Sequence, residues 1–198
     1  MLFETIKIVE GKILNLSYHQ ARFNNTRHRL FDAPTTIDLG LHIHPPKSGI
    51  WRCRIVYAQN IQSVAYIPYH YKKIKTLKLC ESTLSYPFKY TNREVFTQLQ
   101  KEAKGYDDVI IVQDGLITDT TIANIALYKN KHWYTPKTPL LPGTIRAKLL
   151  SESFLHLADI EIHTLGTYTQ VALMNAMVGF RILNHVTIQN TEGKCYDY

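Results

Sequence analysis

The sequence predicts an α+β protein with two domains, a small one at residues 1–68 and a larger one at residues 72–198. Short alternating apolar runs beside turn residues indicate strands, and apolar stripes at helical spacing indicate a few helices. The stretch Pro68-Tyr69-His70-Tyr71 suits a linker, because proline cannot donate to a sheet ladder and so closes the strand before it. With 45% apolar residues, the 198-residue chain can bury a core in each domain.

The first domain opens with a hairpin and a helix. Leu2–Ile8 and Lys12–Leu16 alternate as strands do, and Glu10-Gly11 between them is a turn pair. Ser17 is a good N-cap for a helix that runs to about Leu30, because its hydroxyl can accept from a first-turn amide.

One face of that helix is predicted to be buried. It carries Phe23 and Leu30 together with His19 and Thr26. Arg22 lies one position beside this stripe, where a solvated arginine is the commonest role.

A second short helix is predicted to begin at Pro34-Thr35 and to be ended by Pro45-Pro46 and Gly49. Two strands, Trp51–Ala58 and Ser63–Ile67, then complete the small domain around a turn at Gln59-Asn60.

The larger domain begins with a strand at Ile74–Cys80. Thr91 and Glu94 have capping-box spacing and predict a helix that Gly105 ends, so Lys89 falls on the loop entering that helix. The apolar stripe of this helix consists of Val95, Phe96, Leu99 and Ala103.

Two hairpins and a helix complete the prediction for this domain. The predicted strands are Val109–Gln113, Leu116–Asp119, Ile122–Tyr128 and His132–Thr135. Asp114-Gly115 turns the first pair and Lys129-Asn130-Lys131 the second. The stretch Leu141–Arg146 opens a helix that should bury Ile145, Leu149 and Leu157.

Composition narrows the possible functions without choosing one. The net charge of +7 is spread along the chain, which favours a solvated face, although a basic nucleic-acid-binding protein without catalysis stays possible. Three distant cysteines predict neither a disulfide framework nor a metal site. The alternating start and the lack of a long apolar run predict a cytoplasmic protein without a membrane segment.

Three stretches could carry chemistry. Lys89 lies among aromatic residues, surroundings that lower the pKa of an amine and favour imine chemistry, although a surface cation is the commoner role. Asp119 ends a strand, where a cation such as a pyridinium nitrogen could pair with it, or it could cap the turn at Thr120-Thr121. The glycine-led helix start at Gly143-Thr144 could bind an anion, or it could be ordinary helix entry.

In this order and spacing, the stretches resemble the class IV family of pyridoxal-phosphate enzymes, which includes branched-chain and D-amino-acid aminotransferases and 4-amino-4-deoxychorismate lyase. The resemblance extends over most of the chain, and the stretches that carry it are Phe3–Ile6, His19–Phe23, Lys89, Asp119–Asn124, Gly143–Arg146 and Leu173–Gly179. It implies a larger domain of pseudo-barrel form, a pyridoxal 5'-phosphate cofactor between the domains, a small anionic amine or amino-acid substrate, and a homodimer that binds neither nucleic acid nor membrane.

The resemblance also implies roles for individual residues. Lys89 would form the Schiff base with the cofactor, Arg22 would bind its phosphate, and Asp119 would pair with its pyridine nitrogen. The phosphate cradle would be completed by the amides of Thr144, Ile145, Asn175 and Ala176. The family usually has glutamate where this chain has Asp119, and the chain is short for the family, so part of the usual dimer or substrate surface is expected to be missing.

The reaction is predicted from the residues after the lysine. Aminotransferases of this family commonly carry a tyrosine four or five positions later, where this chain has Arg93 and Glu94. Lys89-Tyr-Thr-Asn92-Arg93 is more similar to the lyase pattern, and Asn175–Gly179 favours the same reading. The favoured function is therefore the lyase of folate synthesis, which releases pyruvate and 4-aminobenzoate. An aminotransferase is the close alternative.

Overall fold

The computed structural model describes residues 1–33 and 35–198, and the chain divides into two compact units. The first unit contains Met1–Tyr71 and Phe88–Asn92, and the second contains Lys72–Pro87 and Arg93–Tyr198. The short segment that carries Lys89 therefore belongs to the first unit, whereas the predicted boundaries put it in the larger domain at residues 72–198.

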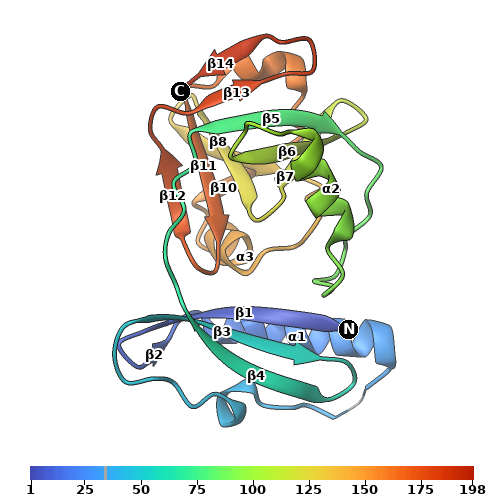
Figure 1. The fold of residues 1–198 in the computed structure, drawn as a ribbon, viewed down its shortest axis with the longest axis vertical. Helices are drawn as coiled ribbons and strands as arrows, with labels where there is room; N and C mark the ends of the chain where they lie inside the picture. The colour runs from blue at the N-terminus through green and yellow to red at the C-terminus, as the bar shows by residue number, and fades with distance from the viewer. Residues whose placement is uncertain (34) are drawn as a thin grey trace. The chain divides into compact units, whose positions relative to one another are not determined.

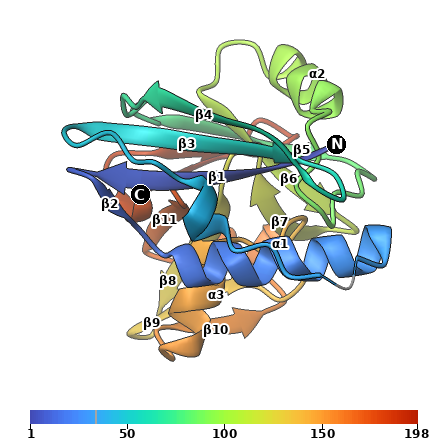
Figure 2. The same cartoon turned by 90° about the horizontal axis from the view of Figure 1, so that it is seen from below.

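The first unit is a four-stranded antiparallel sheet with a helix along one face (Figures 1 and 2). The strands pair in the order β2-β1-β3-β4. Their bounds are β1 Leu2–Val9, β2 Lys12–Ile13, β3 Ile50–Tyr57 and β4 Ile61–Pro68, and the helix α1 is Leu16–Phe31. The mostly apolar inward face of β1 packs with Phe23 of α1 and with inward residues of β3 in one core.

The first hairpin forms at the predicted turn. Glu10 and Gly11 have φ of 47° and 74°, the left-handed conformation that a tight two-residue turn requires. Ile8 pairs with Ile13 across it. The second strand is much shorter than predicted, because the chain turns into α1 at Leu16.

The predicted start of α1 is wrong. Ser17 lies inside the helix, and Asn15 is the N-cap residue, with φ 54° and no side-chain cap hydrogen bond. The predicted stripe also needs correction at Leu30, which is 37% exposed. Arg27 is buried instead, because its guanidinium donates to the carbonyls of Gln59 at 2.7 Å and of Thr35 at 2.7 Å.

The second short helix was predicted to begin at Pro34-Thr35, and Pro34 lies outside the described residues. Further along the same stretch, the structure has one turn of 3-10 helix, η1, at Leu39–His42. Asp38 caps it, because its Oδ1 accepts from the amide of Gly40 at 2.8 Å.

The second unit contains large sheet ladders and few helices, which with the first unit makes a mixed α/β fold. Its helices are α2 Glu94–Glu102, α3 Thr144–Ser151 and the 3-10 helix η2 Ile162–Thr167. Its strands are β5 Thr76–Glu81, β6 Asp108–Gln113, β7 Leu116–Thr120, β8 Asn124–Lys129, β9 His132–Pro136, β10 Leu155–Ala158, β11 Gln170–Asn175, β12 Gly179–Leu183, β13 Thr187–Gln189 and β14 Cys195–Asp197. They pair in the order β10-β9-β8-β7-β6-β5-β13-β14, with β11 between β8 and β12. Figure 1 shows β13 between β5 and β14.

One pair of residues joins two ladders of this sheet. Within the described residues, β7 and β8 share a single paired position, Asp119 opposite Asn124. Beyond it β8 pairs with β9, from Leu127 opposite Tyr134 onward. The pairing of β7 with β8 in the described part of the chain therefore depends on Asp119 and Asn124.

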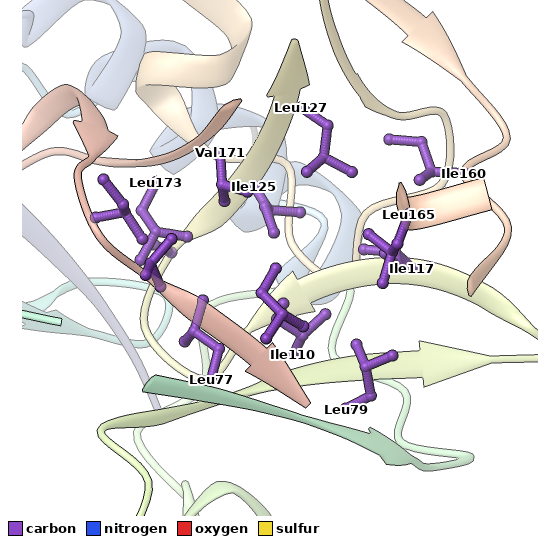
Figure 3. Packing of buried hydrophobic residues seen from close by; sticks show 14 of the residues in the cluster. Leu77, Leu79, Ile110, Ile117, Ile125, Leu127, Ile160, Leu165, Val171 and Leu173 are labelled. Carbon is purple, nitrogen blue, oxygen red and sulfur yellow. The ribbon is translucent and has the colours of Figure 1, made fainter. Parts of the chain in front are cut away.

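The core of the second unit collects apolar side chains from β5, β6, β7, β8 and β11 (Figure 3). Leu77, Ile110 and Ile125 are fully buried in it. Ile160 and Leu165, from the segment around η2, pack into the same cluster. This packing fixes β7 and β8, the strands that carry Asp119 and Asn124.

Two helix predictions for this unit are wrong in detail. Thr91 does not cap α2, because its amide donates to the carbonyl of Met1 at 3.0 Å and Arg93 is the N-cap residue. Leu157 is not on the buried side of α3, since it lies in β10 and is 52% exposed. No helix in the described part of the chain is long and apolar enough to span a bilayer.

Candidate active site

Asp119 is a buried carboxylate near the end of β7, with 3% of its surface exposed. Its Oδ1 accepts from Asn124 Nδ2 at 2.7 Å, and its Oδ2 accepts from the amide of Leu141 at 2.9 Å. Burial raises the pKa of Asp119 to about 7, although the donors on Asn124, Leu141 and Leu140 and the charge of Arg146 act in the opposite direction. A carboxylate whose charge is disfavoured in this way gains strongly from contact with a cation.

The turn after Asp119 is capped by another residue. Thr120 Oγ1 accepts from the amides of Ile122 at 3.3 Å and Ala123 at 3.1 Å. The alternative that Asp119 caps the turn at Thr120-Thr121 is therefore wrong. Asp119 is left to bind side-chain and backbone donors that come from outside the turn.

Asn124 connects Asp119 to the start of α3. Its Nδ2 donates to the carboxylate of Asp119 and also, at 2.9 Å, to the carbonyl of Leu141. Leu141 lies just before Gly143, the N-cap residue of α3. The strand end and the helix start are thus joined through one side-chain amide.

The helix α3 begins after Gly143, where the sequence predicted a helix start. Within the described residues, no side chain caps the helix at Gly143, so its amide dipoles suit an anion. Arg146 on the same turn is 8% exposed and donates to the carbonyl of Pro136 at 2.7 Å. Burial lowers the pKa of Arg146, against the effect of the Asp119 charge.

Asn175 belongs to the same region of the second unit. Its Nδ2 donates to the carbonyl of Ile122 at 3.2 Å, in the turn between Asp119 and Asn124. The preceding residue, Met174, pairs with Asn124 in the β8–β11 ladder. The structure therefore brings Asp119, the start of α3 and Asn175 together around one turn.

Arg93 supports that turn from the side of α2. Its guanidinium donates to the carbonyl of Thr121 at 2.5 Å and lies over the ring of Phe96, 4.4 Å from the centroid. It also lies over the ring of Tyr86 at 5.8 Å. The residue that distinguishes the predicted lyase pattern therefore contacts the turn that comes after Asp119.

Lys89 is held in the first unit by β1. Its carbonyl accepts from the amide of Phe3 at 2.9 Å, and the next residue, Tyr90, forms an isolated bridge with Leu2. The Nζ of Lys89 lies 4.7 Å from the centroid of the Phe3 ring. The aromatic surroundings that the sequence predicted for this lysine include a residue from the start of the chain.

Arg22 is part of a buried network in the first unit. Its Nε and one terminal nitrogen donate to the two carboxylate oxygens of Glu4, at 2.9 and 2.6 Å. His19 Nδ1 lies 2.6 Å from Glu4 Oε2. Burial opposes ionisation, but Arg22 and His19 together hold the pKa of Glu4 at about 2.

Glu4 is the residue of this network that the sequence analysis missed, and the signal was present. Leu2, Glu4, Ile6 and Ile8 alternate onto one face of β1, and all are buried. A carboxylate in such a row needs a cation or hydrogen-bond donors, because burying an unpaired charge is costly. Arg22 supplies both, so it is not the solvated arginine that is commonest at such a position.

Comparison with known proteins places this chain in a family. The chain matches the family model of amino-transferase class IV over residues 52–186. It is 31% identical over 188 residues to an "Uncharacterized protein" of Haemophilus influenzae, a match that covers 90% of this chain and 98% of that protein.

Two solved structures are similar to this protein over most of the chain. A "putative 4-amino-4-deoxychorismate lyase" of Haemophilus somnus is 33% identical with a TM-score of 0.84, covering 90% of this chain and 96% of that one. The 4-amino-4-deoxychorismate lyase of Pseudomonas aeruginosa has a TM-score of 0.71 and covers 97% of this chain and 83% of that one. At 18% identity, the second structure shows the shared fold alone.

The family match decides between the two classes of function that composition left open. A basic nucleic-acid-binding protein without catalysis is not supported, because the matched family is one of pyridoxal-phosphate-dependent enzymes. Since the family model covers more than half of the chain, this protein belongs to the class IV aminotransferase family and is a pyridoxal-phosphate-dependent enzyme.

Proposed function

We propose that this enzyme is a lyase that converts 4-amino-4-deoxychorismate into 4-aminobenzoate and pyruvate, with Lys89 as its catalytic residue. The main support for a cofactor site is the buried carboxylate of Asp119. Asn124 links it to the start of α3, where no side chain caps the helix within the described residues. Family membership implies amine or amino-acid substrates in general. We further propose that the enzyme acts in folate synthesis, in the cytoplasm and as a homodimer.

The residues of the second unit fit pyridoxal phosphate by their chemistry. Asp119 is an acidic acceptor with a pKa raised by burial, which suits a pyridinium nitrogen. The amides of Thr144 and Ile145 stand at a helix start, which suits a phosphate. Asn175 and Ala176, at the end of β11 beside the same turn, would complete the cradle.

Arg22 would bind the same phosphate from the first unit. Its guanidinium donates two hydrogen bonds to Glu4, so the orientation of the guanidinium plane is fixed in the absence of a ligand. Fixing a long side chain in advance lowers the entropy cost of binding. An arginine held in this way suits a dianionic phosphate.

When bound, the cofactor supplies an electron sink for the charge left on the substrate carbon after proton removal. Lys89 Nζ would take the proton from the ring carbon that carries the substrate amine. The bond between the substrate ring and the enolpyruvyl oxygen then breaks, and the departing enolate takes up a proton on carbon to become pyruvate. No oxidant is needed, because loss of the proton and of the leaving group makes the substrate ring aromatic.

The choice of lyase over aminotransferase rests on the residues after Lys89. Arg93 stands where aminotransferases of this family commonly have tyrosine, and it contacts the turn after Asp119. The similarity to the Haemophilus somnus protein, at 33% identity, supports the same choice.

The test supplies purified enzyme with 4-amino-4-deoxychorismate and measures 4-aminobenzoate and pyruvate. A parallel assay measures amino transfer from common amino acids to 2-oxo acids. The visible spectrum with and without added cofactor establishes that the protein is loaded, and Lys89→Ala is the inactive control. Equal amounts of the two products support the lyase, whereas amino transfer without 4-aminobenzoate would assign the aminotransferase instead.

A further inference from the structure

Gly143 is a glycine for reasons of space. A Cβ built on it would lie 1.9 Å from Asn124 Oδ1 and 3.0 Å from Asn124 Cγ, far inside contact distance. Its φ of −74° and ψ of 147° are accessible to any residue, so backbone conformation does not require glycine here. The side chain of Asn124 occupies the place that a larger residue would need.

Two hydrogen bonds fix the Asn124 amide in that place. Its Nδ2 has two hydrogens, and it donates to two acceptors, Asp119 Oδ1 at 2.7 Å and the Leu141 carbonyl at 2.9 Å. The residue is 5% exposed, and its backbone pairs with Asp119 on one side and Met174 on the other. An aspartate here would place a second carboxylate against Asp119, and an alanine would leave both acceptors without this donor.

We propose that Asn124 is a positioning residue that holds the carboxylate of Asp119 and the segment Leu141–Gly143 in one fixed arrangement. This inference rests on the proposed function, in which Asp119 binds the cofactor ring and the start of α3 binds its phosphate. Asn124 touches the supports of both groups, so its amide couples the two ends of one ligand. Its loss should therefore weaken binding at both ends, although it contacts neither group itself.

The first test measures the coupling without cofactor. Thermal unfolding midpoints are measured for apoprotein carrying Asn124→Ala, Gly143→Ala or both. Gly143→Ala should lower the midpoint in the otherwise unchanged chain, and most of that loss should vanish when Asn124 is already alanine. If Gly143→Ala alone fails to fold, folding of the double variant gives the same result. Equal losses in both backgrounds would overturn the proposal.

The second test measures binding of pyridoxal 5'-phosphate, of pyridoxal, which lacks the phosphate, and of inorganic phosphate. Asn124→Ala should weaken binding of both fragments roughly tenfold, the loss expected when a buried acceptor is left without its donor. Thr135→Val is the matched control, because it removes a buried hydrogen bond to the carbonyl of Ile125 at 2.8 Å, whereas the described hydrogen bonds of Asp119 and Leu141 do not involve Thr135. This control should bind all three probes as the unchanged protein does.

The outcomes separate this proposal from the proposed function. If the unchanged protein binds the cofactor and Asn124→Ala binds both fragments as well as Thr135→Val does, only the positioning role is refuted. A loss confined to one fragment also refutes it, because the two ends would then not be coupled through Asn124. If the unchanged protein does not bind pyridoxal 5'-phosphate, the proposed function fails and this inference fails with it.

Discussion

Replacing Asp119 with asparagine should change how the stability of the apoprotein depends on pH. The pKa of Asp119 is raised from 3.8 to about 7, so the folded chain holds this proton more tightly than the unfolded chain. Below about pH 4 the carboxyl is protonated in both states, and above about pH 7 it is ionised in both. Stability should therefore fall as pH rises between these values.

The shift sets the size of the effect. About three pKa units at 1.36 kcal/mol each correspond to about 4 kcal/mol lost from the free energy of unfolding across this range. Asp119→Asn cannot ionise, so it should not show this loss. The two oxygens of Asp119 accept from Asn124 and from the Leu141 amide, and the variant keeps only one of these acceptors. This loss should lower the free energy of unfolding by about 1 to 3 kcal/mol at every pH.

Urea unfolding of both apoproteins at intervals from pH 4 to 8 measures the effect. The stability difference between them removes the contribution of every other titrating group that behaves alike in both. We expect the variant to gain on the unchanged protein as pH rises and then to hold its gain above pH 7. A difference that stays constant with pH would refute the assignment of a raised pKa to Asp119.

Three further outcomes are expected. Lys89→Ala should abolish turnover, and borohydride reduction with cofactor followed by peptide mapping should label Lys89 in the unchanged protein; label on another lysine would refute its role. Arg22→Ala should weaken cofactor binding more than it slows saturated turnover. It should also lower apoprotein stability at pH 7 by part of the about 3 kcal/mol to which the shift of the Glu4 pKa from 4.5 to about 2 corresponds, because Arg22 shares this effect with His19. That stability is present above about pH 4.5 and is lost as pH falls through 2, so a deficit of equal size at pH 2 and pH 7 would contradict it. Gly115→Ala should cost about 1 kcal/mol in urea unfolding, because φ at this turn is 75°, and no change would show that the turn tolerates a side chain.

Local features of the fold could be predicted where a dipeptide determines the backbone. Asp114-Gly115 and Glu10-Gly11 both form the turns expected of them, with positive φ. Helix starts were predicted less well, because Ser17 and Thr91 have the right side chains but stand at the wrong positions relative to tertiary contacts. Asn15 begins α1 from a left-handed conformation, and Thr91 is drawn to the carbonyl of Met1.

The candidate site could be predicted only as separate stretches. The sequence indicates that Asp119 needs a partner. The structure shows that this partner is Asn124, whose second contact, the carbonyl of Leu141, lies 17 residues further along the chain and depends on how β8 meets the start of α3. The role of Glu4 was readable from its place in an alternating apolar row, whereas its pairing with Arg22 required the packing of α1 on β1. Spacing predicts which residue types matter, and tertiary structure determines which of them meet.

Because Phe88–Asn92 belongs to the first unit, the chain cannot be divided into fragments at Tyr71 without removing part of that unit. A fragment ending at Tyr71 would lose the segment whose carbonyl and amide bond to Phe3 and Met1. The edge at the first residues of β1, which β2 does not reach, would then be left open to solvent or to another chain. A peptide spanning Phe88–Asn92, added separately, should bind such a fragment by adding to that edge. Limited proteolysis within residues 72–87 would then give a nicked protein whose pieces stay associated.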